Sequence, residues 1–214
     1  MDTKLDKILI LDFGSQYTQL IARRVREASV YSEIYSWDAE PSQIIEFKPN
    51  GIILSGGPES AFAEGSPKAP QEIFEMGIPI LGICYGMQTM TEQLDGTVLS
   101  STHREFGYAQ IRAHGHSELL KDIQDETNDE GHGLLNVWMS HGDLIEELPT
   151  GFKCTAFTDN SPIAAIENPI KKIYGLQFHP EVAHTSDGIT LLNNFIFDIC
   201  KCNKHWKVDS LAKY

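Results

Sequence analysis

Two short motifs in this 214-residue sequence carry side chains that could perform nucleophilic catalysis. The first is Gly-Ile-Cys-Tyr-Gly at 82–86, in which two glycines permit a sharp turn from a strand into a helix around Cys84. The start of a helix favours the thiolate, and the Tyr85 N–H could face a developing oxyanion. The alternative interpretation of Cys84 is a small residue that lets the strand and helix pack closely.

The second motif is Gln-Phe-His-Pro-Glu at 177–181. A cysteine nucleophile needs a histidine as base, and the histidine needs an acceptor that orients it. In extended chain, residues two apart point the same way, so His179 and Glu181 could reach one site. Two alternatives remain at this level: a core histidine with a satisfied ring, or a metal site formed by His179, Glu181 and His184, although no second ligand group has a suitable spacing.

Two further polar segments come directly after apolar, strand-like runs. Ser-Gly-Gly-Pro at 55–58 exposes backbone N–H groups, so Gly57 could be a second oxyanion donor; it could also be an ordinary turn, and it lacks the Lys-Ser/Thr of a phosphate loop. The segment 138–143 ends in Ser-His-Gly-Asp, which could bind a small zwitterion or simply form a turn that contains an aspartate.

The elements that must position these motifs alternate between strand and helix in the first half. Apolar runs at 7–13, 51–55 and 79–84 and a short run at 33–35 predict strands, and helices are predicted at 16–27, 41–47, 70–76 and 87–94. Such alternation indicates parallel strands. The second half predicts short strands at 97–101, 108–113, 137–140, 152–157, 163–167 and 172–178, then a helix at 186–200. We therefore predict an α/β fold: an open, mainly parallel central sheet flanked by helices, with an antiparallel extension in the second half.

Composition excludes several other classes of protein. The formal net charge of −13 argues against nucleic acid and anionic membrane surfaces as partners. No apolar run approaches a membrane span or a signal-peptide core, so we expect a cytoplasmic protein whose four cysteines form no disulfide framework. The acidic stretch 118–130 is interpreted as a solvated loop.

Together these motifs resemble the class I, triad-type glutamine amidotransferases, and the resemblance extends over about residues 7–206. It implies hydrolysis of glutamine to glutamate and ammonia through a Cys84–His179–Glu181 triad and a thioester intermediate. It also implies an oxyanion hole at Gly57 and Tyr85, with no metal or cofactor for this step. The residues that would bind glutamine are Gly56, Gln88, Ser140, His141 and Asp143.

Three segments, 11–26, 139–143 and 179–185, are similar to one branch of that family, in which an ATP pyrophosphatase domain follows. The Ser-Gly-Gly-x-Asp-Ser loop of that domain is absent here. The resemblance thus implies an amidotransferase domain at 1–200 and a linker at 201–214. The missing synthetase domain would use ATP and Mg²⁺ and could form a homodimer. The rival hypotheses are another γ-glutamyl or cysteine hydrolase of the same fold and an inactive regulatory subunit.

Overall fold

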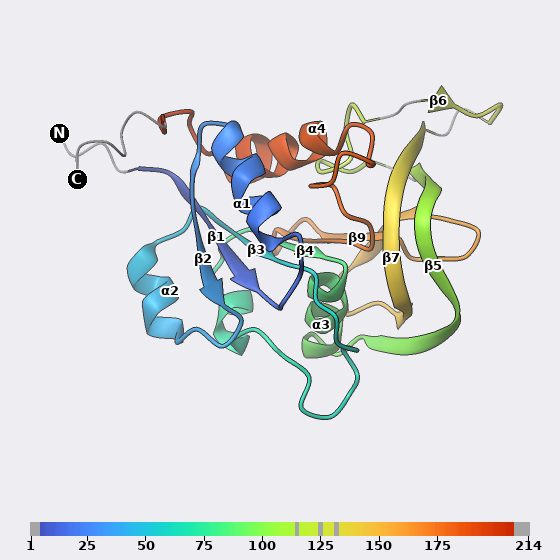
Figure 1. Ribbon diagram of the computed structural model, residues 1–214, viewed down its shortest axis with the longest axis horizontal. Helices are drawn as coiled ribbons and strands as arrows, with labels where there is room; N and C mark the ends of the chain where they lie inside the picture. Colours follow the sequence, from blue (N-terminus) through green and yellow to red (C-terminus); the bar gives the residue numbers. More distant parts are fainter. Residues whose placement is uncertain (1–4, 114–115, 124–125, 131–132, 208–214) are drawn as a thin grey trace.

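The computed structural model describes residues 5–113, 116–123, 126–130 and 133–207. Its centre is a sheet whose strands lie in the order β2-β1-β3-β4-β10-β9-β8-β5-β7-β6 (Figure 1). The strands are β1 (Lys7–Asp12), β2 (Tyr31–Ser36), β3 (Gly51–Leu54), β4 (Ile80–Ile83), β5 (Thr97–Ala113), β6 (Glu126–Thr127), β7 (Gly133–Glu147), β8 (Lys153–Phe157), β9 (Ala165–Asn168) and β10 (Ile173–Leu176).

Helices cover both faces of the parallel part of the sheet. Alternate residues of β1 serve two separate apolar clusters: Ile8 and Ile10 face one, and Leu9 and Leu11 face the other. Helix α1 (Thr18–Glu27) and α4 (Gly188–Asn193) pack on the first face, and α2 (Pro41–Phe47) and α3 (Tyr85–Gln93) on the second (Figure 1). This arrangement confirms the predicted α/β fold.

The parallel strands are β2, β1, β3, β4 and β10, and the remaining pairs are antiparallel. In parallel strands the carboxyl ends meet at one edge of the sheet, where ligands of open α/β sheets bind. The segments that follow β1, β3, β4 and β10 therefore converge there. These are the segments that contain Ser15, Gly57, Cys84 and His179.

Strands β5 and β7 are much longer than predicted. The sequence suggested separate short strands at 97–101 and 108–113, but β5 is continuous through the polar residues between them. Its pairing with β7 shifts register between Ser100 and Glu105, so the chain bends within one ladder instead of ending a strand. In Figure 1 the two curved strands form the side of the sheet farthest from β2.

Two of the predicted helices take tighter or wider turns than an α-helix. The segment predicted at 70–76 is a 3₁₀-helix, η1 (Gln71–Glu75), which leads into the turn at Gly77. The last helix begins as α4 and continues as a π-helix, η2 (Asn194–Ile199). Both segments still bury apolar side chains, so their contribution to the core does not depend on the type of helix.

The acidic stretch 118–130 is not simply a solvated loop. Its described acidic residues are exposed, as expected, but Leu119, Leu120 and Ile123 are buried in the same cluster as α4. The side chain of Asn194 holds this segment by donating to the carbonyl oxygens of Leu119 and Lys121. The apolar residues between the acids therefore anchor the segment to the core.

The described residues after 200, where a linker is predicted, pack on the domain. Cys202 and Trp206 are buried, and the Trp206 N–H donates to the Ser29 carbonyl oxygen. The Asn203 backbone and side chain both donate to the Asp6 carboxylate. Cys202 is held by its N–H bond to the Ile196 carbonyl oxygen, and the Trp206 ring packs against Tyr31.

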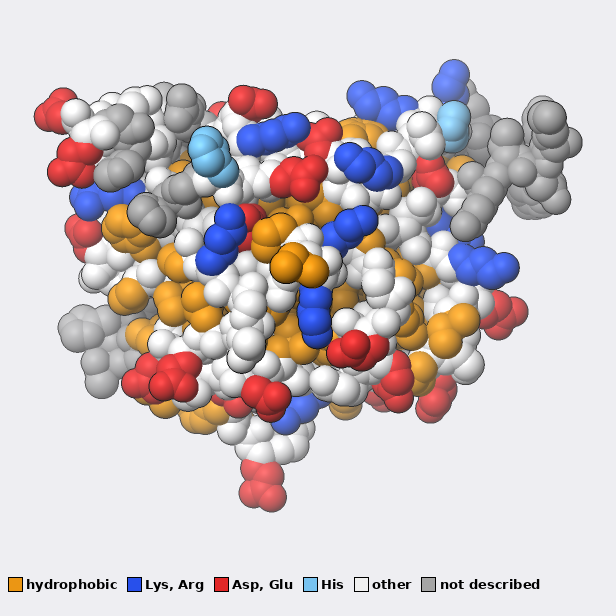
Figure 2. Space-filling model, turned by 180° about the vertical axis from the view of Figure 1, so that it is seen from behind, with side chains coloured by type: hydrophobic (Ala, Val, Ile, Leu, Met, Phe, Trp, Pro, Cys, Tyr) orange, Lys and Arg blue, Asp and Glu red, His pale blue; other side chains and the backbone are white. Residues whose placement is uncertain are grey.

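The surface seen from behind carries acidic and basic side chains interspersed, with apolar side chains between them, and shows no single basic area (Figure 2). Within the described part of the chain, no helix has both the length and the apolar character needed to cross a membrane.

Candidate active site

Cys84 lies between β4 and α3 in a strained backbone conformation, with φ 54° and ψ −110°. Its N–H donates to the Leu176 carbonyl oxygen of β10, which locks the turn onto the sheet. The flanking glycines are required by space: a Cβ on Gly86 would lie 2.3 Å from the Leu54 carbonyl oxygen, and one on Gly82 would lie 2.8 Å from the Gly86 backbone. The strand, turn and helix thus present the sulfur at the carboxyl edge of the sheet.

His179 and Glu181 follow β10 and are paired with each other. The Nδ1 of His179 lies 2.7 Å from Oε1 of Glu181, and both side chains are buried. The His179 backbone is held on both sides: its N–H donates to the Trp138 carbonyl oxygen, and its own carbonyl accepts from Thr185 Oγ1. With Nδ1 committed to the carboxylate, Nε2 is the nitrogen available for Cys84.

The electrostatics of His179 favour the imidazolium. Burial by itself would lower the pKa of His179, but the charge of Glu181 and the hydrogen bond with Cys84 outweigh it and raise the pKa to about 10. At neutral pH the proton therefore resides on the ring. An imidazolium beside Cys84 favours the thiolate, which is the nucleophilic form of a cysteine.

The raised pKa of His179 makes a prediction about stability. In the unfolded chain the ring has a pKa of about 6.5, so its contribution to the folded state is complete below that pH and is lost as the pH rises to about 10. We expect the difference in unfolding free energy between the wild-type chain and His179→Gln to be largest below pH 6.5. It should shrink steadily up to pH 10, as measured by urea unfolding.

The control is the same substitution in a Glu181→Gln background. Since the carboxylate is a main cause of the raised pKa, the effect of His179→Gln should lose most of its pH dependence there. A wild-type difference that stays constant from pH 6 to pH 10 would contradict the assigned electrostatics.

A cavity of about 330 Å³ opens beside the sulfur. It is lined by Gly14, Ser15, Gln16, Tyr17, Gly57, Pro58, Cys84, Ser140 and His179. A Cβ on Gly57 would lie 2.6 Å from the Phe13 carbonyl oxygen, so only glycine fits here. Gly57 and the first residue of α3, Tyr85, flank Cys84, and the first N–H groups of a helix have no partner within the helix. This arrangement could hold an oxyanion formed next to the sulfur.

A second cavity of about 310 Å³ shares Gly57, Pro58 and Ser140 with the first and reaches Gln88, His141 and Asp143. The structure thus places four of the five residues that the sequence proposed for glutamine around these cavities; Gly56 is not among their lining residues. Ser60 donates to the Asp143 carboxylate at 2.5 Å, and Gly56 lies against the His179 ring. The two cavities adjoin at the three shared residues, and the first one reaches the sulfur.

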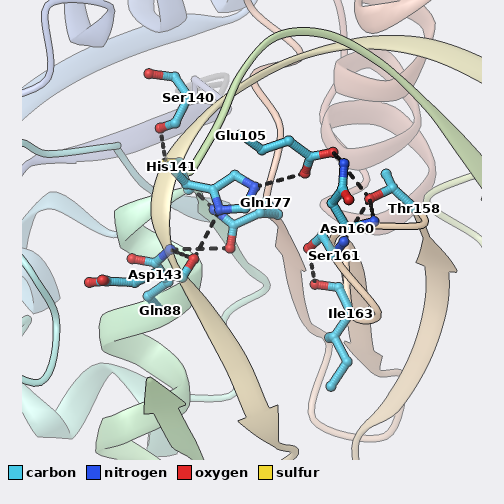
Figure 3. Close-up of polar contacts among 11 residues, drawn as sticks. Gln88, Glu105, Ser140, His141, Asp143, Thr158, Asn160, Ser161, Ile163 and Gln177 are labelled. Atoms are coloured by element: carbon cyan, nitrogen blue, oxygen red, sulfur yellow. Dashed lines mark hydrogen bonds and ion pairs between the residues drawn. The ribbon is translucent and has the colours of Figure 1, made fainter. Parts of the chain in front are cut away.

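Besides Asp143, two more of these side chains are engaged with the protein. His141 has Nδ1 2.9 Å from the Asp143 carbonyl oxygen and Nε2 3.3 Å from Glu105, and burial lowers its pKa (Figure 3). Gln88 donates to that same carbonyl. Both residues therefore fix the backbone of the 140–143 segment.

Sequence reasoning missed the contribution of the loop after β1. Ser15, Gln16 and Tyr17 line the first cavity, and the Tyr17 ring meets His179 edge-on at a centroid distance of 5.2 Å. The predicted order of parallel strands could have revealed this loop, because the loop after β1 lies at the same carboxyl edge of the sheet as the loops after β3 and β4. Gln177 and Glu105, which contact Cys84 and His141, were also missed.

No three His, Cys, Asp or Glu side chains within the described ranges form a group that could hold a metal ion. The His184 ring packs against Trp138 at a centroid distance of 4.7 Å. The arrangement at Cys84 supports acyl transfer by a nucleophile, a base and an orienting acid.

Comparison with known proteins decides the family, because residues 9–199 match the sequence profile described as "Glutamine amidotransferase class-I". The chain belongs to this family. The match begins within β1 and runs to the end of η2, so it includes all the segments that carry the site residues. The class I amidotransferase fold was thus correctly predicted from the motifs.

Curated relatives are considerably longer than this class I amidotransferase chain. It is 60% identical over 202 residues to "GMP synthase [glutamine-hydrolyzing]" of Methylobacillus flagellatus, which covers 94% of this chain and 38% of that protein. The protein of the same name from Methylococcus capsulatus is 57% identical, over 99% of this chain and 40% of its own length. The chain therefore spans about two-fifths of the length of these relatives.

Solved structures share the amidotransferase fold. A putative GMP synthase subunit from Thermoplasma acidophilum matches with a TM-score of 0.80 and 29% identity, over 92% of this chain and 94% of that one. A glutamine amidotransferase of Thermotoga maritima matches with a TM-score of 0.65 over 90% of this chain and 83% of that one. At 19% identity, the second match shows the fold alone.

Proposed function

We propose that this chain is the glutaminase part of a GMP synthase. The observation that carries the proposal is the position of His179, whose Nδ1 lies 2.7 Å from Glu181 Oε1 and whose ring lines the same cavity as Cys84. The names of the relatives at 57–60% identity support the wider assignment. Hydrolysis of a side-chain amide needs a nucleophile, a proton carrier and an oxyanion site, and each has a candidate here.

In the first half of the reaction the Cys84 thiolate attacks the side-chain amide carbon of glutamine. The N–H groups of Gly57 and Tyr85 stabilise the oxyanion, and losing one such donor typically costs about 3 kcal/mol of barrier. His179 gives its proton to the departing nitrogen as the C–N bond breaks. Ammonia leaves, and a γ-glutamyl thioester remains on Cys84.

In the second half water replaces ammonia. His179, now neutral, takes a proton from water as the oxygen attacks the thioester carbon, and the C–S bond breaks to release glutamate and restore the thiolate. Glu181 holds the ring orientation and stabilises the imidazolium in both halves. Gln88, Ser140, His141 and Asp143 form the surroundings of the amino-acid end of glutamine, and Gly56 lies against the His179 ring.

The acceptor of ammonia belongs to the remainder of the longer enzyme. We assign to an ATP pyrophosphatase domain beyond this chain the adenylation of xanthosine monophosphate with ATP and Mg²⁺, and its amination to GMP. The division into an amidotransferase domain at 1–200 and a connecting segment at 201–214, dimerisation through the other domain, and a cytoplasmic location belong to the same proposal. Support comes from the share of the relatives, about two-fifths, that this chain matches.

The test has two arms. The 214-residue chain is assayed for glutamate release from glutamine, γ-glutamyl peptides and casein. The longer enzyme is then assayed for GMP formation from xanthosine monophosphate and ATP, with glutamine or ammonium chloride. We expect glutamine to be the preferred substrate and to support GMP formation. Preference for peptides would favour another hydrolase of this fold, and no release in either arm would favour a regulatory subunit.

A further inference from the structure

Gln177 contacts the sulfur of Cys84 from outside the expected triad. It lies directly after β10 and is completely buried, and its Nε2 is 3.7 Å from Cys84 Sγ. Its backbone N–H donates to Ala164, so the main chain at this point is tied into the antiparallel part of the sheet. A buried amide aimed at a reactive sulfur calls for a chemical explanation, since an apolar side chain could fill the same space.

The orientation of the Gln177 amide is determined by its neighbours. The Gln88 Nε2 lies 3.1 Å from the Asp143 carbonyl oxygen, which can only accept, so this atom is the nitrogen. The same Nε2 lies 3.1 Å from Oε1 of Gln177 and donates to it (Figure 3). Because the Gln177 oxygen is thereby identified, its N–H group must face the sulfur.

Three polar groups surround the sulfur. The Ser140 carbonyl oxygen, at 3.4 Å, can only accept and therefore favours the protonated thiol. His179 and Gln177 can donate to sulfur and favour the thiolate. His179 must release its proton when ammonia leaves, whereas Gln177 keeps its N–H throughout the reaction.

We propose that Gln177 is a further catalytic residue that stabilises the Cys84 thiolate, and that Gln88 is the positioning residue that orients it. The inference rests on the proposed nucleophilic role of Cys84. It also gives Gln88 a role beside its predicted place near glutamine. The amide supplies a neutral, fixed hydrogen bond to sulfur that does not depend on the protonation state of His179.

The test measures the thiolate directly by alkylation. In the 214-residue chain, the rate of iodoacetamide labelling at Cys84 is followed against pH by mass spectrometry of its peptide. In Gln177→Met we expect the half-maximal pH to rise by about one unit, since a hydrogen bond to a charged group is lost. Below the wild-type half-maximal pH, Cys84 in Gln177→Met should be labelled about tenfold more slowly than in the wild-type chain. A merely structural role would leave the half-maximal pH unchanged.

The matched control is Asn194→Leu, which removes another buried amide, one that donates to the carbonyl oxygens of Leu119 and Lys121. It should destabilise the fold without moving the half-maximal pH. Gln88→Met should shift that pH in the same direction as Gln177→Met but by less, because the Gln177 amide keeps its N–H but loses its orientation. If circular dichroism shows that Gln177→Met is unfolded, the half-maximal pH of Gln88→Met is the result that tests the inference.

An unchanged half-maximal pH in the deciding variant overturns the inference. Alkylation needs no turnover of glutamine, so a shifted value supports it even for a chain that fails the glutaminase assay. Failure of the proposed function and failure of this inference are thus separate results.

Discussion

Cys84→Ala should lower glutamine hydrolysis by at least about 10⁴-fold, measured as glutamate release. The substitution removes the sulfur that lines the cavity together with His179 and contacts Gln177, and no thioester can form without it. The fold should be retained, because alanine fills the same turn between β4 and α3. In the longer enzyme, GMP formation from ammonium chloride should persist, since that route bypasses the thioester.

The control for Cys84→Ala is Cys154→Ala. Cys154 lies in β8, where burial raises the pKa of its thiol, and its Sγ contacts the carbonyl oxygens of Ala156 and Pro162. The Cys154→Ala variant should hydrolyse glutamine at the wild-type rate. Activity in Cys84→Ala within tenfold of wild type, or loss of activity in Cys154→Ala, would remove Cys84 from the mechanism.

Gly86→Ala should prevent stable folding, with a loss of at least about 3 kcal/mol in unfolding free energy. The added methyl group would lie 2.3 Å from the Leu54 carbonyl oxygen and 2.8 Å from the carbonyl carbon and Cβ of the same residue. Leu54 belongs to the central strand β3, so neither backbone can move without disturbing the sheet. Urea unfolding followed by circular dichroism measures the loss.

The control for Gly86→Ala is Gly77→Ala, which tests the effect of backbone conformation without close contacts of the added methyl group. Gly77 has φ +69°, but no heavy atom lies within 4 Å of an added Cβ. Its replacement should cost only about 1 kcal/mol, the penalty for placing a side chain in that backbone conformation. Equal losses for the two variants would show that the close contact of α3 with β3 does not determine the effect.

The parallel half of the fold was predictable because its strands are buried on both faces. Such strands are continuous apolar runs, as at 8–11 and 52–54, and the helices between them have one apolar face. The long β5 and β7 were not predictable in the same way. Their length comes from pairing with each other on both sides of the register shift between Ser100 and Glu105, which is a long-range contact and not a local sequence pattern.

The candidate site shows the same division. The turn glycines, Cys84, His179 and Glu181 stand in motifs whose chemistry is readable from residue types and spacing. The direction of the Gln177 side chain is not, because it depends on Gln88 from α3 and on the Asp143 carbonyl of β7. The burial of Trp206 against the end of α1 is likewise a property of distant contacts and not of the local sequence.

The conformation of Cys84 has a consequence for the evolution of such chains. A side chain at φ 54° and ψ −110° costs about 1–3 kcal/mol that glycine would avoid. Selection for stability alone would therefore favour glycine at position 84, and only selection for the chemistry of sulfur opposes it. In a lineage released from glutamine hydrolysis, this position should drift toward glycine early, while the turn and the sheet around it persist.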